Sequence, residues 1–324
     1  MSDLIQIGSL ILLFLFLGLA AEVVVVNVQT LGYRLRIAPF SLGLLLGVFT
    51  SFPETFIGIN ATLRGISTIS LGNLMGGTLV LLALISGLAI VLGHTIRTTQ
   101  LVPAKWRWIM GGYMILPLIL ISDGLLSVTD GVALVILYLL IVNGMIDHRA
   151  NEHLEKAEDS SHKKISTKKA LSFALIGLAG VIVISHFLVD LTMSLVERFS
   201  LPLFFTGLVG FSLGTNLPEL SVAYTSWKHG IKRLALGNLM GSAFTNPFIV
   251  GVLAIMRPIE TLTSLSFWIF AILLALVVFC HIWFGVTDHK FTTKEGIILL
   301  ILYGLFLLIE FGCLGFASSA ACVR

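Results

Sequence analysis

The sequence predicts an all-α integral membrane protein whose ten transmembrane helices form two inverted-topology repeats of five helices each. Three observations support this prediction. The chain of 324 residues is 57% hydrophobic and only 11% charged, whereas soluble domains contain about 25% charged residues. Its basic residues gather in alternate loops, and one motif recurs 165 residues further along the chain. A net charge of +3 on such an apolar chain gives no reason to expect a nucleic-acid partner.

Ten apolar stretches are each close to the roughly 20 residues that a helix needs to cross a bilayer. They lie at about residues 4–26, 38–63, 68–92, 107–121, 129–146, 170–196, 201–227, 233–256, 262–285 and 295–313. The fourth is the shortest, and a polar stretch separates it from the fifth. The first follows the acidic Asp3 and is too long for the apolar core of a cleavable signal peptide, so we expect it to be a span.

The distribution of lysine and arginine over the loops predicts the orientation of the chain. Sixteen of these 20 residues lie in the loops after the odd-numbered spans, and four lie on the other side. Because cytoplasmic loops carry the excess of basic residues, both termini are predicted to lie outside the cytosol. The absence of transit and sorting signals fits a plasma or inner cell membrane, so we expect the chain to span that lipid bilayer.

One long polar segment, residues 147–169, separates a first five-helix half, residues 1–146, from a second, residues 170–324. The segment contains three histidines among acidic and basic side chains. Their irregular spacing favours a solvated cytosolic linker over a metal site.

The two halves share an internal repeat. Between residues 50–76 and 215–241, 11 of 27 positions are identical, including a Pro-Glu pair and all of "LGNLMG". A match of this kind at one fixed offset indicates an internal duplication. Five predicted spans separate the copies, so the second enters the membrane from the opposite side. Inverted repeats of this kind build secondary transporters, with the site at the midplane where the repeats meet.

The repeat places one carboxylate in each half, Glu54 and Glu219, within an apolar stretch. A carboxylate at this depth is costly and is usually functional or paired, and no Lys or Arg lies at a plausible facing position in the spans. Two neighbouring carboxylates need either protons or a cation, and together they balance one divalent ion. Hard oxygen ligands favour calcium or sodium over a soft metal.

Helix geometry adds further oxygen atoms near each carboxylate. Thr50 lies four residues before Glu54 and shares its helix face, and Thr215 is placed in the same way before Glu219. The proline before each glutamate removes an N–H group and disturbs the carbonyl four residues earlier. Broken helices offer such carbonyls to cations.

The facing helix of the second repeat carries Ser242 and Asn246, again four residues apart. The glycines of "LGNLMG" let helices approach closely, so that two helices can reach one ion.

The segments "TSFPE…LGNLMGG" and "GTNLPE…LGNLMGSAFTN" resemble the two alpha-repeats of the sodium/calcium exchanger family, which belongs to the cation/calcium antiporters. The alpha-repeats would span about residues 41–90 and 206–255. The resemblance covers essentially the whole chain and implies ten helices, termini outside and a cytosolic loop between helices five and six. Because that loop is short here, the chain looks like the compact prokaryotic type.

The resemblance also implies a set of cation ligands. Glu54 and Glu219 match the central calcium ligands, and Asn216 takes the place of the second serine. The other matching positions offer hydroxyl, amide or backbone oxygens to sodium or calcium: Gly47, Thr50, Ser51, Ser212, Thr215, Ser242 and Asn246.

The first repeat departs from the family pattern at two positions. Gly77 stands where the family has serine, and Leu81 where it has Asn or Asp; Asn246 is an amide and not an acid. Fewer oxygen atoms should mean fewer or weaker sodium sites. Coupling to protons is the alternative, since a carboxylate pair readily takes up protons.

These features predict a secondary active antiporter that exports calcium in exchange for sodium or protons, with no cofactor besides the transported ions. The alternatives are an antiporter of another cation, a divergent relative that no longer transports, and a passive channel. An enzyme is not expected, because the chain contains no H-E-x-x-H motif and no cluster of histidines in its spans.

Other polar residues in the spans are predicted to have structural roles. His186 lies one helical turn before Asp190 and is expected to bond to it, while an ion-path role for Asp190 stays open. Glu310 and His281 lie near the ends of their spans and are interpreted as interfacial.

Overall fold

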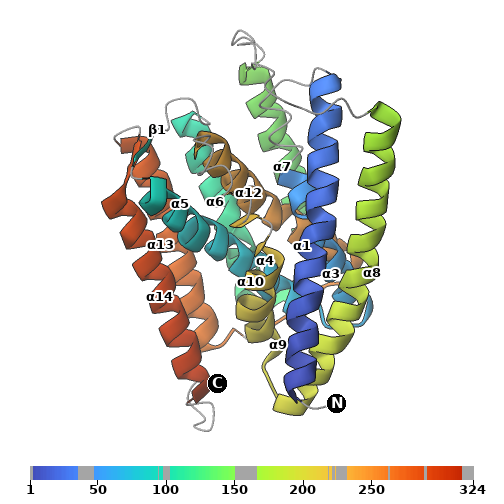
Figure 1. Ribbon diagram of the computed structural model, residues 1–324. Coiled ribbons are helices and arrows are strands. Elements are labelled where there is room, and N and C mark those ends of the chain that lie inside the picture. The colour runs from blue at the N-terminus through green and yellow to red at the C-terminus, as the bar shows by residue number, and fades with distance from the viewer. Residues whose placement is uncertain are drawn as a thin grey trace.

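The computed structural model describes residues 3–35, 47–93, 95–97, 103–149, 166–217, 219–220, 223, 232–261, 263–287 and 290–315. This part of the chain is a helix bundle (Figure 1). Its helices are α1 (Asp3–Arg34), α3 (Phe52–Leu63), α4 (Ser67–Leu79), α5 (Ser86–Gly93), α6 (Ala104–Leu120), α7 (Val128–Arg149), α8 (Thr167–Phe199), α9 (Leu203–Phe205), α10 (Ser212–Thr215), α12 (Lys232–Met256), α13 (Leu265–Thr287) and α14 (Thr293–Gly315). Two segments are π-helical, η1 (Val80–Ile85) and η3 (Thr206–Phe211), and η2 (Ile121–Asp123) is a 3-10 turn.

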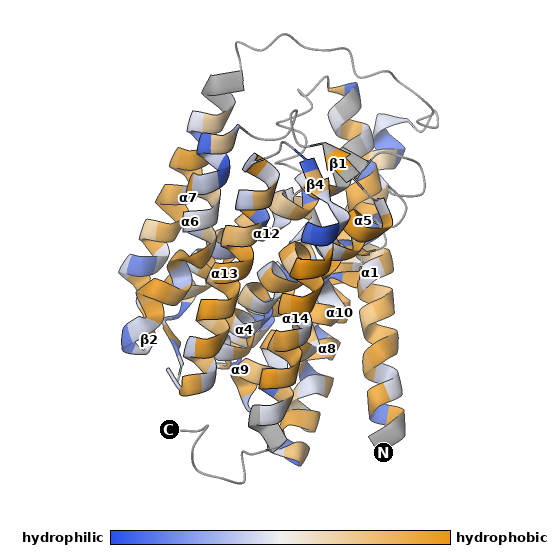
Figure 2. Cartoon of the chain, turned by 90° about the vertical axis from the view of Figure 1, so that its left-hand side faces the viewer, coloured by the Kyte–Doolittle hydropathy of each residue, from blue (hydrophilic) through white to orange (hydrophobic). Residues whose placement is uncertain are grey.

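The helices agree with the predicted class of multi-pass membrane protein. Seven described segments are long and apolar enough to cross a bilayer: Ile5–Gly32, Ser67–Gly93, Val128–Met145, Thr167–Phe199, Leu236–Met256, Leu265–Thr287 and Thr293–Gly312. Each matches a predicted span, and α6, with 17 residues, matches the short fourth one. Parts of the spans predicted at 38–63 and 201–227, and most of the linker 147–169, lie outside the described residues. Figure 2 shows apolar residues along most of the length of the helices.

Burial distinguishes central helices from peripheral ones. The share of buried positions was compared over the most apolar 18 residues of each segment. It is 83% in Ser67–Gly93 and 78% in Leu236–Met256, against 22% in Ile5–Gly32 and 33% in Thr167–Phe199. The segment from α4 to α5 and helix α12 therefore form the centre. α1 and α8 run side by side along one edge of the bundle (Figure 1).

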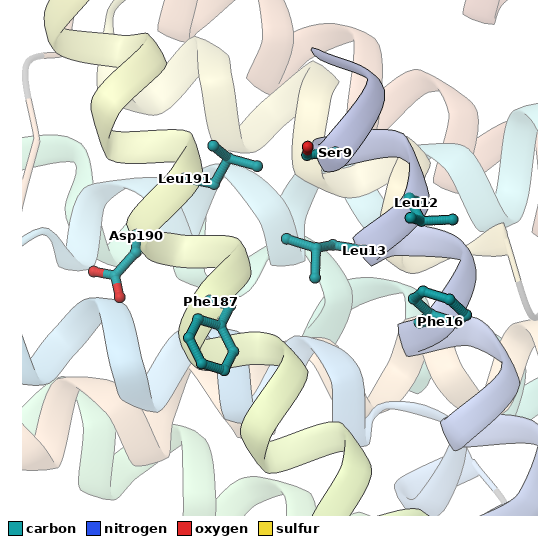
Figure 3. Close-up of a pocket in the computed structure, with 7 residues that line it drawn as sticks. All are labelled: Ser9, Leu12, Leu13, Phe16, Phe187, Asp190 and Leu191. Atoms are coloured by element: carbon teal, nitrogen blue, oxygen red, sulfur yellow. The ribbon is translucent and has the colours of Figure 1, made fainter. Parts of the chain in front are cut away.

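An open, apolar groove lies between α1 and α8. Leu13 and Phe16 of α1 and Phe187 and Leu191 of α8 are among its lining residues (Figure 3). The carboxylate of Asp190, at the margin of the groove, points away from α1. The groove is therefore apolar for most of its surface, and neither glutamate of the predicted cation site lines it.

Asp190 instead joins α8 to the C-terminal end of α3. Its carboxylate pairs with Arg64, and the Arg64 guanidinium also lies 3.1 Å from Nδ1 of His186. Nε2 of His186 is 3.7 Å from the Asp190 carboxylate, which confirms the predicted contact between these two residues. Nearby, the Asn60 amide donates a hydrogen bond to the Ser185 hydroxyl at 3.1 Å. Polar contacts thus join α8 to α3 in the conformation that the structure describes.

Replacing Arg64 by glutamine or Asp190 by asparagine is expected to lower the free energy of unfolding only slightly. Their side chains are 28% and 50% exposed, and exposed ion pairs contribute about 0.2–1 kcal/mol. A double-mutant cycle on thermal unfolding in detergent isolates the pairwise contribution from the effect of each side chain alone. A coupling of about 3 kcal/mol, as in a buried pair, would contradict this expectation.

Two short strand pairs, which the sequence analysis did not predict, tie the two halves of the chain together. β1 (Thr95–Arg97) pairs antiparallel with β4 (Lys290–Thr292), and β2 (Leu125–Leu126) pairs antiparallel with β3 (Ile259–Glu260). α6 lies between β1 and β2 in the sequence, so the two pairs lie near opposite ends of the bundle (Figure 2).

Glu310 and His281, both interpreted as interfacial from their positions near span ends, are buried within the protein. Glu310 of α14 is 3% exposed, and its two carboxylate oxygens accept hydrogen bonds from the Ser266 hydroxyl at 3.1 and 3.0 Å. His281 of α13 is 2% exposed, and its ring lies 5.0 Å from that of Phe291. Neighbouring helices and β4 cover these positions, and a position near the end of a span does not reveal such packing.

Candidate cation site

Two helix breaks, at equivalent positions of the repeats, form the centre of the candidate site. α3 begins after a turn at Ser51 (φ −84°, ψ 11°), and α10 ends at Asn216 (φ −90°, ψ 10°). Pro53 lies in the first turn of α3, where its missing N–H leaves no intrahelical hydrogen bond unmade. Pro218 lies outside the described residues. The repeat seen in the sequence therefore extends to the backbone conformation.

Glycines bring the broken helices into close contact with α4 and α12. A Cβ on Gly47 would lie 3.2 Å from the carbonyl carbon of Gly241 in α12. A Cβ on Gly207, in η3, would overlap the carbonyl oxygen of Ile69 in α4. Backbone touches backbone at these places. A Cβ on Gly72 or Gly76 of the first "LGNLMG" would likewise overlap a carbonyl oxygen, that of Phe204 or Leu208, which confirms that glycines of this motif serve close helix approach.

All ten residues of the predicted site are buried. Gly47 is buried, and the other nine residues are at most 4% exposed: Thr50, Ser51, Glu54, Ser212, Thr215, Asn216, Glu219, Ser242 and Asn246. Burial of so many polar groups in an apolar bundle is costly unless they are paired, so their contacts decide what the site can hold.

The carboxylates of Glu54 and Glu219 lie close enough to interact electrostatically, and the Thr215 side chain lies near the Glu54 carboxylate. One oxygen of each carboxylate, Oε2, is buried without a hydrogen-bond partner among the described residues. Among the described residues, neither glutamate forms a salt bridge. Two buried carboxylates without a basic partner are chemically suited to hold protons or a cation.

On one side of these carboxylates, hydroxyl groups gather around Gly47. The Thr50 hydroxyl lies 2.9 Å from that of Ser242, so α12 faces the break at Ser51 as predicted. The hydroxyls of Thr50 and Ser51 donate to the Gly47 carbonyl at 3.1 and 3.0 Å. This side therefore offers a cluster of uncharged oxygen atoms.

On the other side, amide groups dominate. The Asn216 amide donates to the Ser212 carbonyl at 2.8 Å, and the Asn246 amide donates to the Leu74 carbonyl at 2.9 Å. Leu81 is buried in the apolar core, so this position supplies no side-chain oxygen.

Two buried residues that the sequence analysis did not single out also contact the site. The Thr215 hydroxyl donates to Oδ1 of Asn73 at 3.2 Å, and the Asn246 amide lies 3.1 Å from the Thr78 hydroxyl. Asn73 belongs to the repeated "LGNLMG", so its identity in both copies was the available signal. Thr78 has no such signal, because Ala243 occupies its place in the second copy.

Comparisons with known proteins identify the family of the chain. The model of the sodium/calcium exchanger protein family matches residues 5–146 and 169–312. The sodium/calcium exchanger MaX1 of Methanosarcina acetivorans is 23% identical over 355 residues, covering 95% of this chain and 99% of that protein. The inner membrane protein YrbG of Escherichia coli is 26% identical over 267 residues, covering 79% of this chain and 82% of that protein.

A solved structure has the same fold. One structure of the sodium-calcium exchanger NCX_Mj superposes with a TM-score of 0.67 at 22% identity, covering 95% of this chain and 98% of that one. The family is one of membrane transporters and not of enzymes. Since the family model matches nearly all of both halves, the chain belongs to the sodium/calcium exchanger protein family.

Proposed function

We propose that this protein is a secondary active antiporter that exports calcium in exchange for sodium or protons. The observation that carries the proposal is the pair of buried carboxylates, Glu54 and Glu219, one from each repeat and without a basic partner among the described residues. The matching family and the relative named as a sodium/calcium exchanger support the choice of ions.

The proposed site uses the ten predicted residues, with Glu54 and Glu219 as the central ligands. Two carboxylates balance the charge of one calcium ion, and the hydroxyls around Thr50 and Ser242 add neutral oxygens. The same carboxylates would take up sodium ions or protons once calcium has left. Because the two kinds of cargo compete for one pair of charges, their movements are coupled.

The proposed topology has ten spans in two inverted five-helix repeats, residues 1–146 and 170–324. The linker 147–169 is cytosolic, and both termini lie outside the cytosol. Alternating access then requires a movement between two bodies of the protein. α1 and α8 pack along one edge of the bundle and contribute no residue to the proposed ligand set, which suits them to slide past the central helices.

Two residues of the first repeat bear on the choice between sodium and protons as the coupling ion. Gly77 and Leu81 supply no side-chain oxygen, which favours fewer sodium ions per cycle or their replacement by protons. An antiporter of another divalent cation is the second candidate, because the same carboxylates would balance its charge.

Transport into proteoliposomes tests the proposal. Vesicles containing the purified protein are loaded with sodium, with potassium or with an acidic buffer, and uptake of radioactive calcium is measured after dilution. We expect uptake in the sodium-loaded or the acid-loaded vesicles and none in the potassium-loaded ones. Equal uptake under all three conditions would indicate a channel, and no uptake in any would refute calcium antiport.

A further inference from the structure

The two sides of the candidate site differ by an exchange of side-chain volume between the repeats. Ser51 of the first repeat corresponds to Asn216 of the second, and Gly77 corresponds to Ser242. The hydroxyl side, formed by Thr50, Ser51 and Ser242, therefore carries a hydroxyl at both exchanged positions. The amide side, formed by Gly77, Asn216 and Asn246, carries a larger amide at one of them and no side chain at the other. The contacts of Ser242 on the hydroxyl side can therefore be compared with those of Gly77 on the amide side.

On the hydroxyl side, the side chain of the facing helix completes a pair. The Ser242 hydroxyl lies 2.9 Å from that of Thr50. Both groups present oxygen atoms, which is the surface that a small hard cation needs.

On the amide side, the absence of a side chain at Gly77 makes room for two amides. A Cβ built on Gly77 would lie 3.1 Å from Nδ2 of Asn216 and 3.3 Å from Nδ2 of Asn246. Both distances are shorter than ordinary van der Waals contact, so the amides already occupy the space that a side chain there would take. A serine at position 77 and the asparagine at position 216 therefore compete for one volume.

The amide groups also have the wrong polarity for a cation. Nδ2 of Asn216 donates to the Ser212 carbonyl, and Nδ2 of Asn246 donates to the Leu74 carbonyl and lies near the Thr78 hydroxyl. The nitrogen atoms, whose hydrogens carry partial positive charge, are thus the atoms nearest to Gly77. Backbone acceptors hold them in this orientation.

We propose that Gly77 and Asn216 act as a coupled, specificity-determining pair that closes one side of the site to a monovalent cation. Bare sodium ions then bind only on the side of Thr50, Ser51 and Ser242, next to the two carboxylates. If one side is closed, fewer sodium ions move in each transport cycle; this consequence rests on the proposed function. The packing part of the inference stands on the contacts alone.

The test is a double-mutant cycle with Gly77→Ser, Asn216→Ser and the double variant, which would reproduce the hydroxyl side on both sides. Thermal unfolding of the purified protein in detergent is measured without added ions and across a sodium titration. We expect each single variant to lose about 3 °C or more and the double variant to regain most of that loss. Sodium should stabilise the double variant at a concentration roughly tenfold lower than wild type requires, because the variant gains a second set of hydroxyl ligands.

Gly112→Ser is the matched control, since a Cβ on Gly112 of α6 meets no atom within 4 Å. If Gly77→Ser does not fold, Gly77→Ala, which adds only the Cβ, takes its place in the cycle. Additive effects in the cycle, or a double variant with the sodium response of wild type, would overturn the proposal. Both readouts are independent of calcium transport, so a wild-type protein that moves no calcium would refute the antiport proposal while the cycle still decides the pair.

Discussion

Replacing Glu54 by glutamine is expected to reduce calcium uptake into proteoliposomes by about 100-fold or more. The change keeps the shape of the side chain and removes one of the two charges that balance the ion. Breaking a buried ionic interaction by removing one partner costs about 3–5 kcal/mol, and each 1.36 kcal/mol is a factor of ten. Glu219→Gln should have the same effect, because the two glutamates occupy equivalent positions in the repeats.

Glu310→Gln is the matched control for this measurement. Glu310 is as deeply buried as Glu54, at 3% exposed for both, but it bonds to Ser266 between α13 and α14. We expect calcium uptake by Glu310→Gln to stay within about twofold of wild type, because this glutamate is buried but lies outside the proposed ligand set. Equal loss in all three variants would show a general intolerance of buried charge removal and would contradict the assignment of the site to Glu54 and Glu219.

The largest effect on folding is expected from Gly207→Ala. A Cβ at this position would overlap the carbonyl oxygen of Ile69 and lie 2.9 Å from the backbone nitrogen of Asn73. Both neighbours are backbone atoms, so no change of rotamer can relieve the contact, and η3 must move away from α4. Overpacking of this kind costs 1–3 kcal/mol and occasionally more; we expect about 3 kcal/mol or a failure to fold.

Gly210→Ala, in the same π-helical segment, isolates the packing effect from helix propensity. A Cβ on Gly210 meets no atom within 4 Å, so this variant should unfold at or slightly above the wild-type temperature. Thermal unfolding monitored by size-exclusion chromatography compares the two. If both variants behave alike, the close approach of η3 to α4 does not limit stability.

The class of fold could be predicted because its signals are local or repeat at a fixed distance. Long apolar stretches identify spans wherever they occur, and the shared Pro-Glu pair correctly located the two helix breaks near Ser51 and Asn216. The prediction that Ser242 faces the first break was also correct, because the repeat implies which helix lies opposite which.

Features that depend on contacts between distant segments could not be predicted. The role of Thr78 depends on Asn246, 168 residues away, and no repeat marks it. The burial of Glu310 depends on the neighbouring α13, and the strand pairs depend on loops that meet only in the folded bundle. The volume exchange at Gly77 was visible in the sequence as a missing oxygen, but its compensation by Asn216 requires the distances between the two helices.

The strand pairs have a consequence for the biogenesis of the protein. β1 lies before α6, yet its partner β4 precedes the last described helix. That helix, α14, packs on α5, where a Cβ on Gly296 would lie 3.0 Å from the carbonyl oxygen of Gly87. During synthesis, α5 and β1 therefore meet these partners only after β4 and α14 have been made. α5 and β1 are therefore not fully packed when α7 leaves the ribosome, and their packing is completed only by β4 and α14.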